Sequence, residues 1–327
     1  MGAGSIGGWL GGKLQAAGVA VHFVGRPRML AALAQHGLTL TDRDGQRHHL
    51  PPERLRLHDD VPNGLAPALV LLCVKSGATA NAAAELGQCL PAGTVVLSMQ
   101  NGIGNAAAAQ AAAPLLQVLP GMVPYNVAEL GPGHLHRGTD GQLAAQDHPT
   151  LRALAPVLAA AGLPLALHAD LAAVQWGKLL LNLNNAVNAL SGLPLREQLL
   201  DHDLRRCTAG LIAETLAVLR RAGIQPAQMS PLPPALLPLV LRLPTPLFKR
   251  AAARMLRIDS QARSSMADDL ALGRPTEVDA INGEVVRLAE QMGRSAPRNA
   301  HISTLVQAWP ARPQPMGGRV LRQVLGL

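Results

Sequence analysis

Residues 2–7 read Gly-Ala-Gly-Ser-Ile-Gly, and this glycine spacing constrains the fold more than any other feature of the chain. In the G-x-G-x-x-G pattern the first glycine permits a tight turn, the second lets the backbone approach a pyrophosphate, and the third lets a helix pack closely on a strand. The amides at the start of that helix then face the phosphates. The pattern predicts a dinucleotide-binding loop made by Gly2, Ala3, Gly4, Ser5, Ile6 and Gly7.

The residues that follow alternate short apolar runs with alanine-rich helical stretches. Continuous apolar runs are typical of strands that are covered on both faces by helices. Strands and helices in series imply right-handed crossovers, and hence an α/β fold with a Rossmann-like, doubly wound parallel sheet. The strands are expected at Ala20–Val24, Ala68–Val74 and Thr94–Ser98, and the helices at Ile6–Ala17, Arg28–His36, Ala78–Gln88 and Asn105–Ala112.

The first strand of this fold is missing from the sequence as given. The glycine pattern should follow a strand, and only Met1 precedes Gly2. In a doubly wound sheet that strand lies at the centre, so its absence would leave two neighbouring strands without ladder partners. We therefore expect a truncated first strand, with the natural start roughly five to eight residues upstream, which is the length of an ordinary strand.

From about Pro164 onward the pattern becomes helical, which predicts a second, all-helical domain. We expect a nucleotide-binding domain at 1–165, a helical substrate domain at 166–310, and a poorly ordered tail at 311–327 that is rich in proline, glycine and arginine. The proline-rich segment 226–246 is expected to be a surface excursion, with a substrate lid as the alternative. The predicted helices are Ala172–Leu190, Leu204–Ala222, Pro246–Arg257, Ser264–Leu272 and Thr276–Met292.

A formal charge of +8 is compatible with nucleic-acid binding, but two other features oppose it. Aromatic residues make up only 2% of the chain, so platforms for base stacking are scarce. The basic residues are spread out and form no dense tract. A polyanionic cofactor and a carboxylate substrate suit a basic protein equally well, and we expect no nucleic-acid partner.

The cysteines and the apolar runs point to the compartment. Cys73, Cys89 and Cys207 have no paired spacing, which fits a reducing compartment and predicts neither a disulfide framework nor a metal site. No signal peptide is recognisable, and no uncharged apolar run reaches the roughly 18–20 residues that a bilayer requires. We expect a soluble, cytoplasmic protein with no membrane partner. The oligomeric state is left open, with a homodimer among the alternatives.

Two arginines, Arg26 and Arg28, follow the strand expected at Ala20–Val24, which is the second strand of the fold. Proteins that prefer NAD usually place an acid here to hold the ribose hydroxyls, and this chain has none. A guanidinium instead suits the 2′-phosphate of NADP through charge-assisted, bidentate hydrogen bonds. The sequence therefore favours NADPH over NADH, although both arginines could also be ordinary surface charges.

Lysine is rare in this chain, with only four among the 29 basic residues, so its positions are informative. Lys75 ends a predicted strand, at the edge where open α/β sheets bind ligands. Lys178 stands with Asn182 and Asn185 at i, i+4 and i+7, hence on one face of a leucine-rich helix. That polar face indicates either a cleft or a solvent-exposed surface.

At this point the residues resemble the ketopantoate reductase (2-dehydropantoate 2-reductase) family, which has a helical domain like that of 6-phosphogluconate dehydrogenase. Matching pieces occur in order across nearly the whole chain, and the last is the most specific. They are Gly2–Gly7, Arg26, Cys73-Val74-Lys75, Gln100-Asn101-Gly102, Trp176-Gly177-Lys178-Leu179, Ser264-Ser265-Met266 and Thr276–Gly283.

The resemblance implies a role for each matching residue. Arg26 and Lys75 would hold the 2′-phosphate, and Asn101 would lie near the nicotinamide ribose and the substrate. Val127 would contact the cofactor through its backbone. In the helical domain the matching residues are Lys178 as proton donor, Asn182 and Ser265 as substrate ligands, and Glu277 as an acid beside the cofactor and the lysine.

The chain departs from the family pattern at one position. The family usually has a second asparagine eight residues after the lysine, and Ala186 occupies that position here. Asn185 or Asn188 would have to substitute for it as a substrate ligand. The departure keeps open a relative that reduces another 2-oxo acid or an imine.

The expected chemistry agrees with this resemblance. Hydride transfer from NADPH to a small 2-oxo acid develops negative charge on the carbonyl oxygen, which an ammonium group stabilises and then protonates. Lys178 is the candidate donor, and Glu277 would orient it and tune its pKa. A solvated Glu277 and a helix-capping serine at 264 or 265 are the purely structural alternatives. A catalytically silent NADP(H)-binding protein is the alternative from another functional class.

Overall fold

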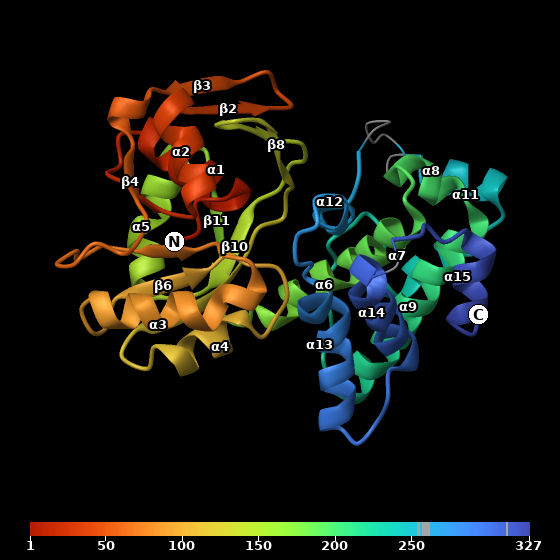
Figure 1. Ribbon diagram of the computed structural model, residues 1–327. Coiled ribbons are helices and arrows are strands. Elements are labelled where there is room, and N and C mark those ends of the chain that lie inside the picture. The colour runs from red at the N-terminus through yellow and green to blue at the C-terminus, as the bar shows by residue number, and fades with distance from the viewer. Residues whose placement is uncertain (254–255, 257–261, 312) are drawn as a thin grey trace. The chain divides into compact units, whose positions relative to one another are not determined.

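The computed structural model describes residues 1–253, 256, 262–311 and 313–327, and it forms two compact units, Met1–Leu171 and Ala172–Leu327 (Figure 1). The boundary falls a few residues beyond the predicted position at residue 165. The first unit is α/β and the second is helical, as the sequence predicts.

The first unit contains most of the predicted elements and several that the sequence did not reveal. The helices are α1 (Ser5–Ala16), α2 (Pro27–His36), α3 (Thr79–Cys89), α4 (Asn105–Ala112) and α5 (Pro149–Ala160), with short 3₁₀ turns at Pro52–Arg54 and Ser76–Ala78. The strands are β1 (His22–Val24), β2 (Leu38–Asp42), β3 (Arg47–Leu50), β4 (Arg56–His58), β5 (Val70–Leu72), β6 (Val95–Ser98), β7 (Gln117–Met122), β8 (Val127–Gly131), β9 (His134–Arg137), β10 (Leu143–Gln146) and β11 (Leu165–His168).

These strands form a mixed arrangement rather than one wholly parallel sheet. A five-stranded sheet has the order β11-β10-β7-β6-β5, and β1 pairs with β4 separately. The pairs β5–β6, β6–β7 and β1–β4 are parallel, as predicted, but β10 runs antiparallel to β7. The predicted parallel Rossmann-like sheet is therefore confirmed for β5, β6 and β7, and β10 adds an antiparallel strand to it, because no helical crossover lies between β7 and β10.

Met1 lies between β1 and β5, where the sequence places the absent central strand. Its amino group donates to Leu71 O at 3.0 Å, and its carbonyl accepts from Cys73 N at 2.8 Å. On the other side, Gly2 N and Ala3 N donate to Val24 O at 2.8 and 2.9 Å. These bonds join the edges of two otherwise separate sheets. The truncation of a first strand stays a prediction.

A second, four-stranded sheet has the order β3-β2-β9-β8 and packs against α1. The glycines along one face of α1 permit this close contact. A Cβ at Gly12 would come within 2.7 Å of Leu38 Cδ2, and one at Gly8 within 2.8 Å of Leu135 Cδ1. The glycines beyond the fingerprint therefore position the phosphate-loop helix on this sheet.

The second unit is made of helices around α9. Its elements are α6 (Ala172–Asn182), α7 (Asn184–Ser191), α8 (Leu195–Leu200), α9 (His202–Arg221), α10 (Leu237–Leu241), α11 (Thr245–Ala251), α12 (Ser265–Ala271), α13 (Val278–Gln291), α14 (Pro297–Ala308) and α15 (Gly318–Val324), with 3₁₀ turns at Pro234–Leu236 and Trp309–Ala311. The helix predicted at Ala172–Leu190 is divided between α6 and α7. Much of the end of the helix predicted at Pro246–Arg257 lies outside the described residues.

The proline-rich segment 226–246 packs on α6 at its start. Ala227 N donates to Ala173 O at 2.8 Å. A Cβ at Gly177 would come within 2.2 Å of Ala227 O, so only glycine permits this contact. The start of the predicted surface excursion is therefore fixed against α6 at Gly177, the residue that precedes Lys178.

The prediction of a poorly ordered tail at 311–327 is wrong for most of that range. Leu321 of α15 is fully buried, and Gly210 of α9 has no side chain, which lets Leu327 approach. Arg322 Nε also lies 3.1 Å from Asp203 Oδ1. The proline, glycine and arginine content obscured a short amphipathic helix that is stabilised by tertiary packing.

In the described part of the chain, no helix has the length and apolarity that crossing a membrane requires.

Candidate active site

The phosphate loop has a different environment at each of its three glycines. Gly2 has φ +90°, and a Cβ there would come within 2.6 Å of Val74 N. A Cβ at Gly7 would come within 2.2 Å of Gly2 O, whereas one at Gly4 would meet no atom within 4 Å. The first and third glycines thus permit close packing, and the second faces open space. These are the properties that a pyrophosphate-binding loop needs.

The N-terminus of α1 fits the same ligand. Gly4 occupies the N-cap position, and no side chain caps the helix. The first amides of a helix have no intrahelical acceptor, and the helix dipole favours an anion there. The loop and the helix terminus therefore fit a dinucleotide phosphate.

The two candidate guanidiniums have different surroundings. Arg28 makes a bidentate contact with Glu129 of β8, at 3.2 and 3.1 Å. This hydrogen bond and the carboxylate charge raise the pKa of Arg28. Arg26 is exposed at the start of α2, and its side chain has no partner within the described residues. Arg26 is therefore the guanidinium that can bind an added phosphate.

Lys75 and Asn101 follow neighbouring parallel strands, β5 and β6. Both residues lie at the carboxyl edge of the sheet, where doubly wound folds bind ligands. Lys75 is exposed and precedes the 3₁₀ turn at Ser76. Asn101 is half-buried and precedes Gly102, whose φ of +92° makes the turn that glycine favours.

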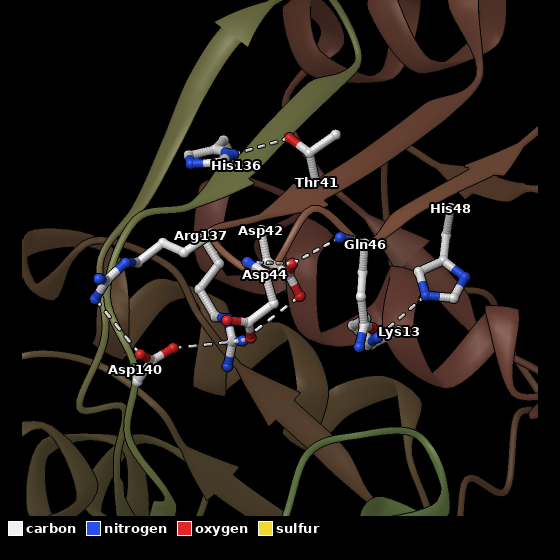
Figure 2. Close-up of polar contacts among 10 residues, drawn as sticks. Lys13, Thr41, Asp42, Asp44, Gln46, His48, His136, Arg137 and Asp140 are labelled. Carbon is white, nitrogen blue, oxygen red and sulfur yellow. Dashed lines mark hydrogen bonds and ion pairs between the residues drawn. The ribbon is translucent and has the colours of Figure 1, made fainter.

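Val127 begins β8 and pairs with Arg137 of β9. The Arg137 guanidinium lies 3.5 Å from the buried Asp42 carboxylate, and also contacts Asp44 and Asp140 (Figure 2). Its carbon lies 6.0 Å from the Trp9 ring on α1. Arg137 thus connects the strand pair that carries Val127 to the phosphate-loop helix, a contribution that the sequence did not predict.

Lys178 and Glu277 interact electrostatically within the second unit. Lys178 is half-buried in α6, and Glu277 is 8% exposed at the residue before α13. Burial lowers the pKa of Lys178 to about 8, while the Glu277 carboxylate opposes part of that shift. An amine with a pKa near neutrality can donate a proton at physiological pH.

The structure distinguishes among the asparagines and Ala186. Asn188 is fully buried: its Nδ2 donates to Leu193 O at 2.9 Å and its Oδ1 accepts from Ser264 N at 2.9 Å. Ala186 is fully buried as well. Asn182 and Asn185 are half-buried. Of the two substitutes that the sequence left open, Asn188 stabilises the fold and Asn185 is the candidate ligand.

The two adjacent serines also have separate roles. Ser264 is the N-cap of α12, because its Oγ accepts from Ala267 N at 3.2 Å. Ser265 is the first helical residue and is exposed. The capping role that the sequence assigned to either serine therefore belongs to Ser264, which leaves Ser265 as the candidate substrate hydroxyl.

Two family models cover most of the chain. The model described as "Ketopantoate reductase PanE/ApbA" matches residues 1–150, and the C-terminal model of the same family matches residues 170–309.

Curated relatives and solved structures agree with these models. The 2-dehydropantoate 2-reductase of Halobacterium salinarum is 29% identical over 94% of this chain and 96% of its own. That of Archaeoglobus fulgidus is 27% identical over 94% and 95%. A ketopantoate reductase structure from Ralstonia eutropha has a TM-score of 0.79 at 29% identity, covering 94% of this chain and 96% of that one. A D-mandelate dehydrogenase complex with NADH and anilino(oxo)acetate shares the fold, with a TM-score of 0.76 at 21% identity over 94% and 96%.

A glycine loop on a Rossmann-like unit, followed by a helical unit with a desolvated lysine and a carboxylate, defines a class of two-domain oxidoreductases. The chain belongs to the ketopantoate reductase family within that class.

Proposed function

We propose that this chain reduces 2-dehydropantoate (ketopantoate) to pantoate with NADPH, on the route to pantothenate and coenzyme A. The observation that carries the proposal is the half-buried Lys178 ammonium of α6, which interacts electrostatically with the buried Glu277 carboxylate and whose pKa is lowered by burial to about 8. The relatives named 2-dehydropantoate 2-reductase support the substrate. A cytoplasmic location and a homodimer belong to the same proposal, and a Staphylococcus aureus structure of this fold is described as a dimeric ketopantoate reductase.

In the proposed reaction, NADPH held by the first unit would supply the hydride for the ketone carbon. Lys178 Nζ donates its proton to the ketone oxygen as negative charge develops there. Glu277 holds the amine in its charged form, because a nearby carboxylate raises the pKa of an ammonium. Asn182, Asn185 and Ser265 hydrogen-bond the substrate's oxygen atoms and orient it.

The proposed cofactor contacts come from the first unit. The amides of the glycine loop bind the pyrophosphate, Arg26 and Lys75 bind the 2′-phosphate, and Asn101 and Val127 lie near the nicotinamide ribose. The exposed Arg26 guanidinium, which has no side-chain partner in the described part of the chain, supports NADPH over NADH. Because the D-mandelate dehydrogenase of the same fold is described with NADH, the preference needs a direct test.

The test is oxidation of NADPH and NADH by the full chain with ketopantoate and a panel of other 2-oxo acids. Lys178→Ala should lower turnover by about 10²–10⁴-fold, the usual contribution of a positioned proton donor, while NADPH still binds. Lys249→Ala, an exposed lysine of α11, is the matched control and should retain parental turnover. Equal turnover in Lys178→Ala and the parent would remove Lys178 from the mechanism.

Ala186 favours one second candidate, the reduction of a different 2-oxo acid or an imine. The missing amide changes the hydrogen bonds that the substrate can make, and such changes alter specificity strongly. A faster rate with another member of the panel than with ketopantoate would establish this candidate. NADPH binding with no turnover on any substrate would identify a catalytically silent protein instead.

A further inference from the structure

A network of buried polar side chains lies behind the two strand ends that carry Lys75 and Asn101. Its members share very low exposure and come from the end of β6 and from α3 and α4: Thr79 (2% exposed), Ser98 (3%), Gln100 (7%) and Asn105 (8%). Buried polar groups are costly unless they are paired, and fully paired networks favour one arrangement of the chain.

Gln100 connects the end of β6 to the residue before Lys75. Its Nε2 donates to Val74 O at 2.9 Å and to Thr79 Oγ1 at 2.6 Å. Its Oε1 accepts from Ser98 Oγ at 2.9 Å. One amide therefore fixes the distance between two neighbouring strand ends.

Asn105 makes the corresponding connection on the other side of Lys75. Its Nδ2 donates to Asn101 O at 2.6 Å and to Ser76 Oγ at 3.3 Å, and its Oδ1 accepts from Thr79 Oγ1 at 3.0 Å. The Thr79 hydroxyl also lies 2.8 Å from Ser76 O, so two acceptors share its proton. The residues on both sides of Lys75, and the Asn101 carbonyl, are thus all bound to this network.

We propose that Gln100, Thr79 and Asn105 are positioning residues for dinucleotide binding, which hold the Lys75 and Asn101 backbones at a fixed spacing. The inference rests on the proposed function, since it takes Lys75 and Asn101 as cofactor ligands. Ligands that are fixed in advance avoid the entropy cost of ordering on binding. The network acts through these two residues and does not touch the cofactor itself.

The sharpest test is Asn105→Asp, measured as the NADPH dissociation constant of the full chain at pH 8 and pH 5. At pH 8 an ionised aspartate has no hydrogen to donate and repels the Asn101 carbonyl. The ratio of variant to parent dissociation constants should then be about ten or more, which is the effect of losing one hydrogen bond, here the bond from residue 105 to Asn101 O. Burial at this position and the adjacent Asn101 carbonyl disfavour the ionised form and raise the pKa of the introduced carboxyl. At pH 5 its protonated form can therefore donate to Asn101 O, and the ratio should fall toward one. The Michaelis constant for NADPH should follow the same ratio, with turnover at saturating NADPH retained.

Gln110→Glu is the matched control, because it makes the same amide-to-acid change on the same helix. Gln110 bonds Ala113 O, Leu116 O and Val118 N, away from the strand ends. Its ratio should stay near one at both pH values. A ratio near one for Asn105→Asp at pH 8, or an equal loss of binding in both variants, would overturn the inference and leave the proposed function intact. A parent chain that binds no NADPH would overturn both.

Thr79→Val and Thr79→Ser decide the matter if Asn105→Asp does not fold. Valine has the same shape but no hydroxyl, so Gln100 loses an acceptor and Asn105 loses a donor. Serine keeps both bonds. NADPH binding should weaken several-fold in Thr79→Val and recover in Thr79→Ser, whereas equal binding in the two variants would contradict the proposal.

Discussion

Two desolvated cations in the second unit, Lys178 and Arg205, show how burial serves chemistry in one place and stability in another. Burial lowers the pKa of both groups. Lys178 is half-buried and its ammonium interacts with the Glu277 carboxylate. Arg205 is fully buried, and the atoms that accept its hydrogen bonds are all neutral.

The contacts of Arg205 are those of a structural residue. Its guanidinium donates to Leu199 O, Leu241 O and Leu243 O at 2.9–3.1 Å and to Thr245 Oγ1 at 3.2 Å. Its carbon lies 4.2 Å over the Phe248 ring. Leu199 and Leu241 lie at the ends of α8 and α10, where helix carbonyls have no intrahelical donor. Arg205 thus joins the end of the proline-rich segment to α9.

The comparison shows that the two residue types differ in whether they release a proton when they are buried. An arginine keeps its proton in any protein environment, so a buried guanidinium serves as a permanent hydrogen-bond donor. A lysine can lose its proton when it is desolvated, so burial makes it a proton donor near neutral pH. The reciprocal changes below test that distinction.

The largest expected effect is that of Lys178→Arg on turnover. A guanidinium keeps the positive charge but does not release a proton, so turnover should fall by about 10²–10⁴-fold. NADPH binding, measured by titration, should be unchanged. Lys249→Arg provides the matched control on an exposed lysine. Retained turnover in Lys178→Arg would mean that a positive charge at this position is enough for catalysis and that proton donation does not distinguish Lys178 from Arg205.

Arg205→Met should have the next largest effect, on stability rather than on chemistry. The change removes the Arg205 donors from two buried carbonyl groups, those of Leu199 and Leu241, and from the part-buried carbonyl of Leu243. Each buried carbonyl left without a donor costs about 1–3 kcal/mol, so the free energy of unfolding should fall by about 2 kcal/mol or more. Denaturant unfolding measures it. Arg220→Met, at an exposed position on the same helix, should cost less than about 0.5 kcal/mol. A similar loss in both variants would show that the carbonyl contacts are not what makes Arg205 stabilising.

The smallest expected effect is a shift of the pH profile in Glu277→Gln. The reaction needs the protonated amine, so kcat/KM of the parent should fall about tenfold per pH unit above the Lys178 pKa of about 8. Because the Glu277 carboxylate raises that pKa, its neutral amide should move the alkaline limb to lower pH. A pH series of NADPH oxidation measures both. An unmoved limb would mean that Glu277 does not tune Lys178.

Burial of Lys178 also predicts the sign of its effect on stability. The pKa of Lys178 is lower in the folded chain than in the unfolded chain, so folding disfavours the charged form. This contribution destabilises the fold fully below pH 8, and it disappears as pH rises toward the ordinary lysine pKa near 10.5.

Much of the first unit could be predicted because local patterns decide it. The helix α4 follows from an alanine-rich run and has the predicted bounds, Asn105–Ala112. The strands β1 and β6 follow from continuous apolar runs and lie within the predicted ranges Ala20–Val24 and Thr94–Ser98. The β2–β3 and β8–β9 strands were missed, since polar or charged residues and glycine interrupt every apolar run in them. Their pairing joins residues 39 and 134, far apart in sequence. No local pattern records such a contact.

The candidate site divides in the same way. The sequence by itself determined the glycine loop, the helix that carries Lys178 and Asn182, and the order of the motifs, because each depends on backbone freedom or on local spacing. It did not reveal that Asn185 lies on the next helix, α7. Tertiary structure alone decided that Arg28 is tied to Glu129, that Asn188 and Ser264 are structural, and that Arg205 is buried among carbonyls. Those outcomes depend on partners distant in the sequence, and a hydrogen bond forms only where folding brings its donor and acceptor together.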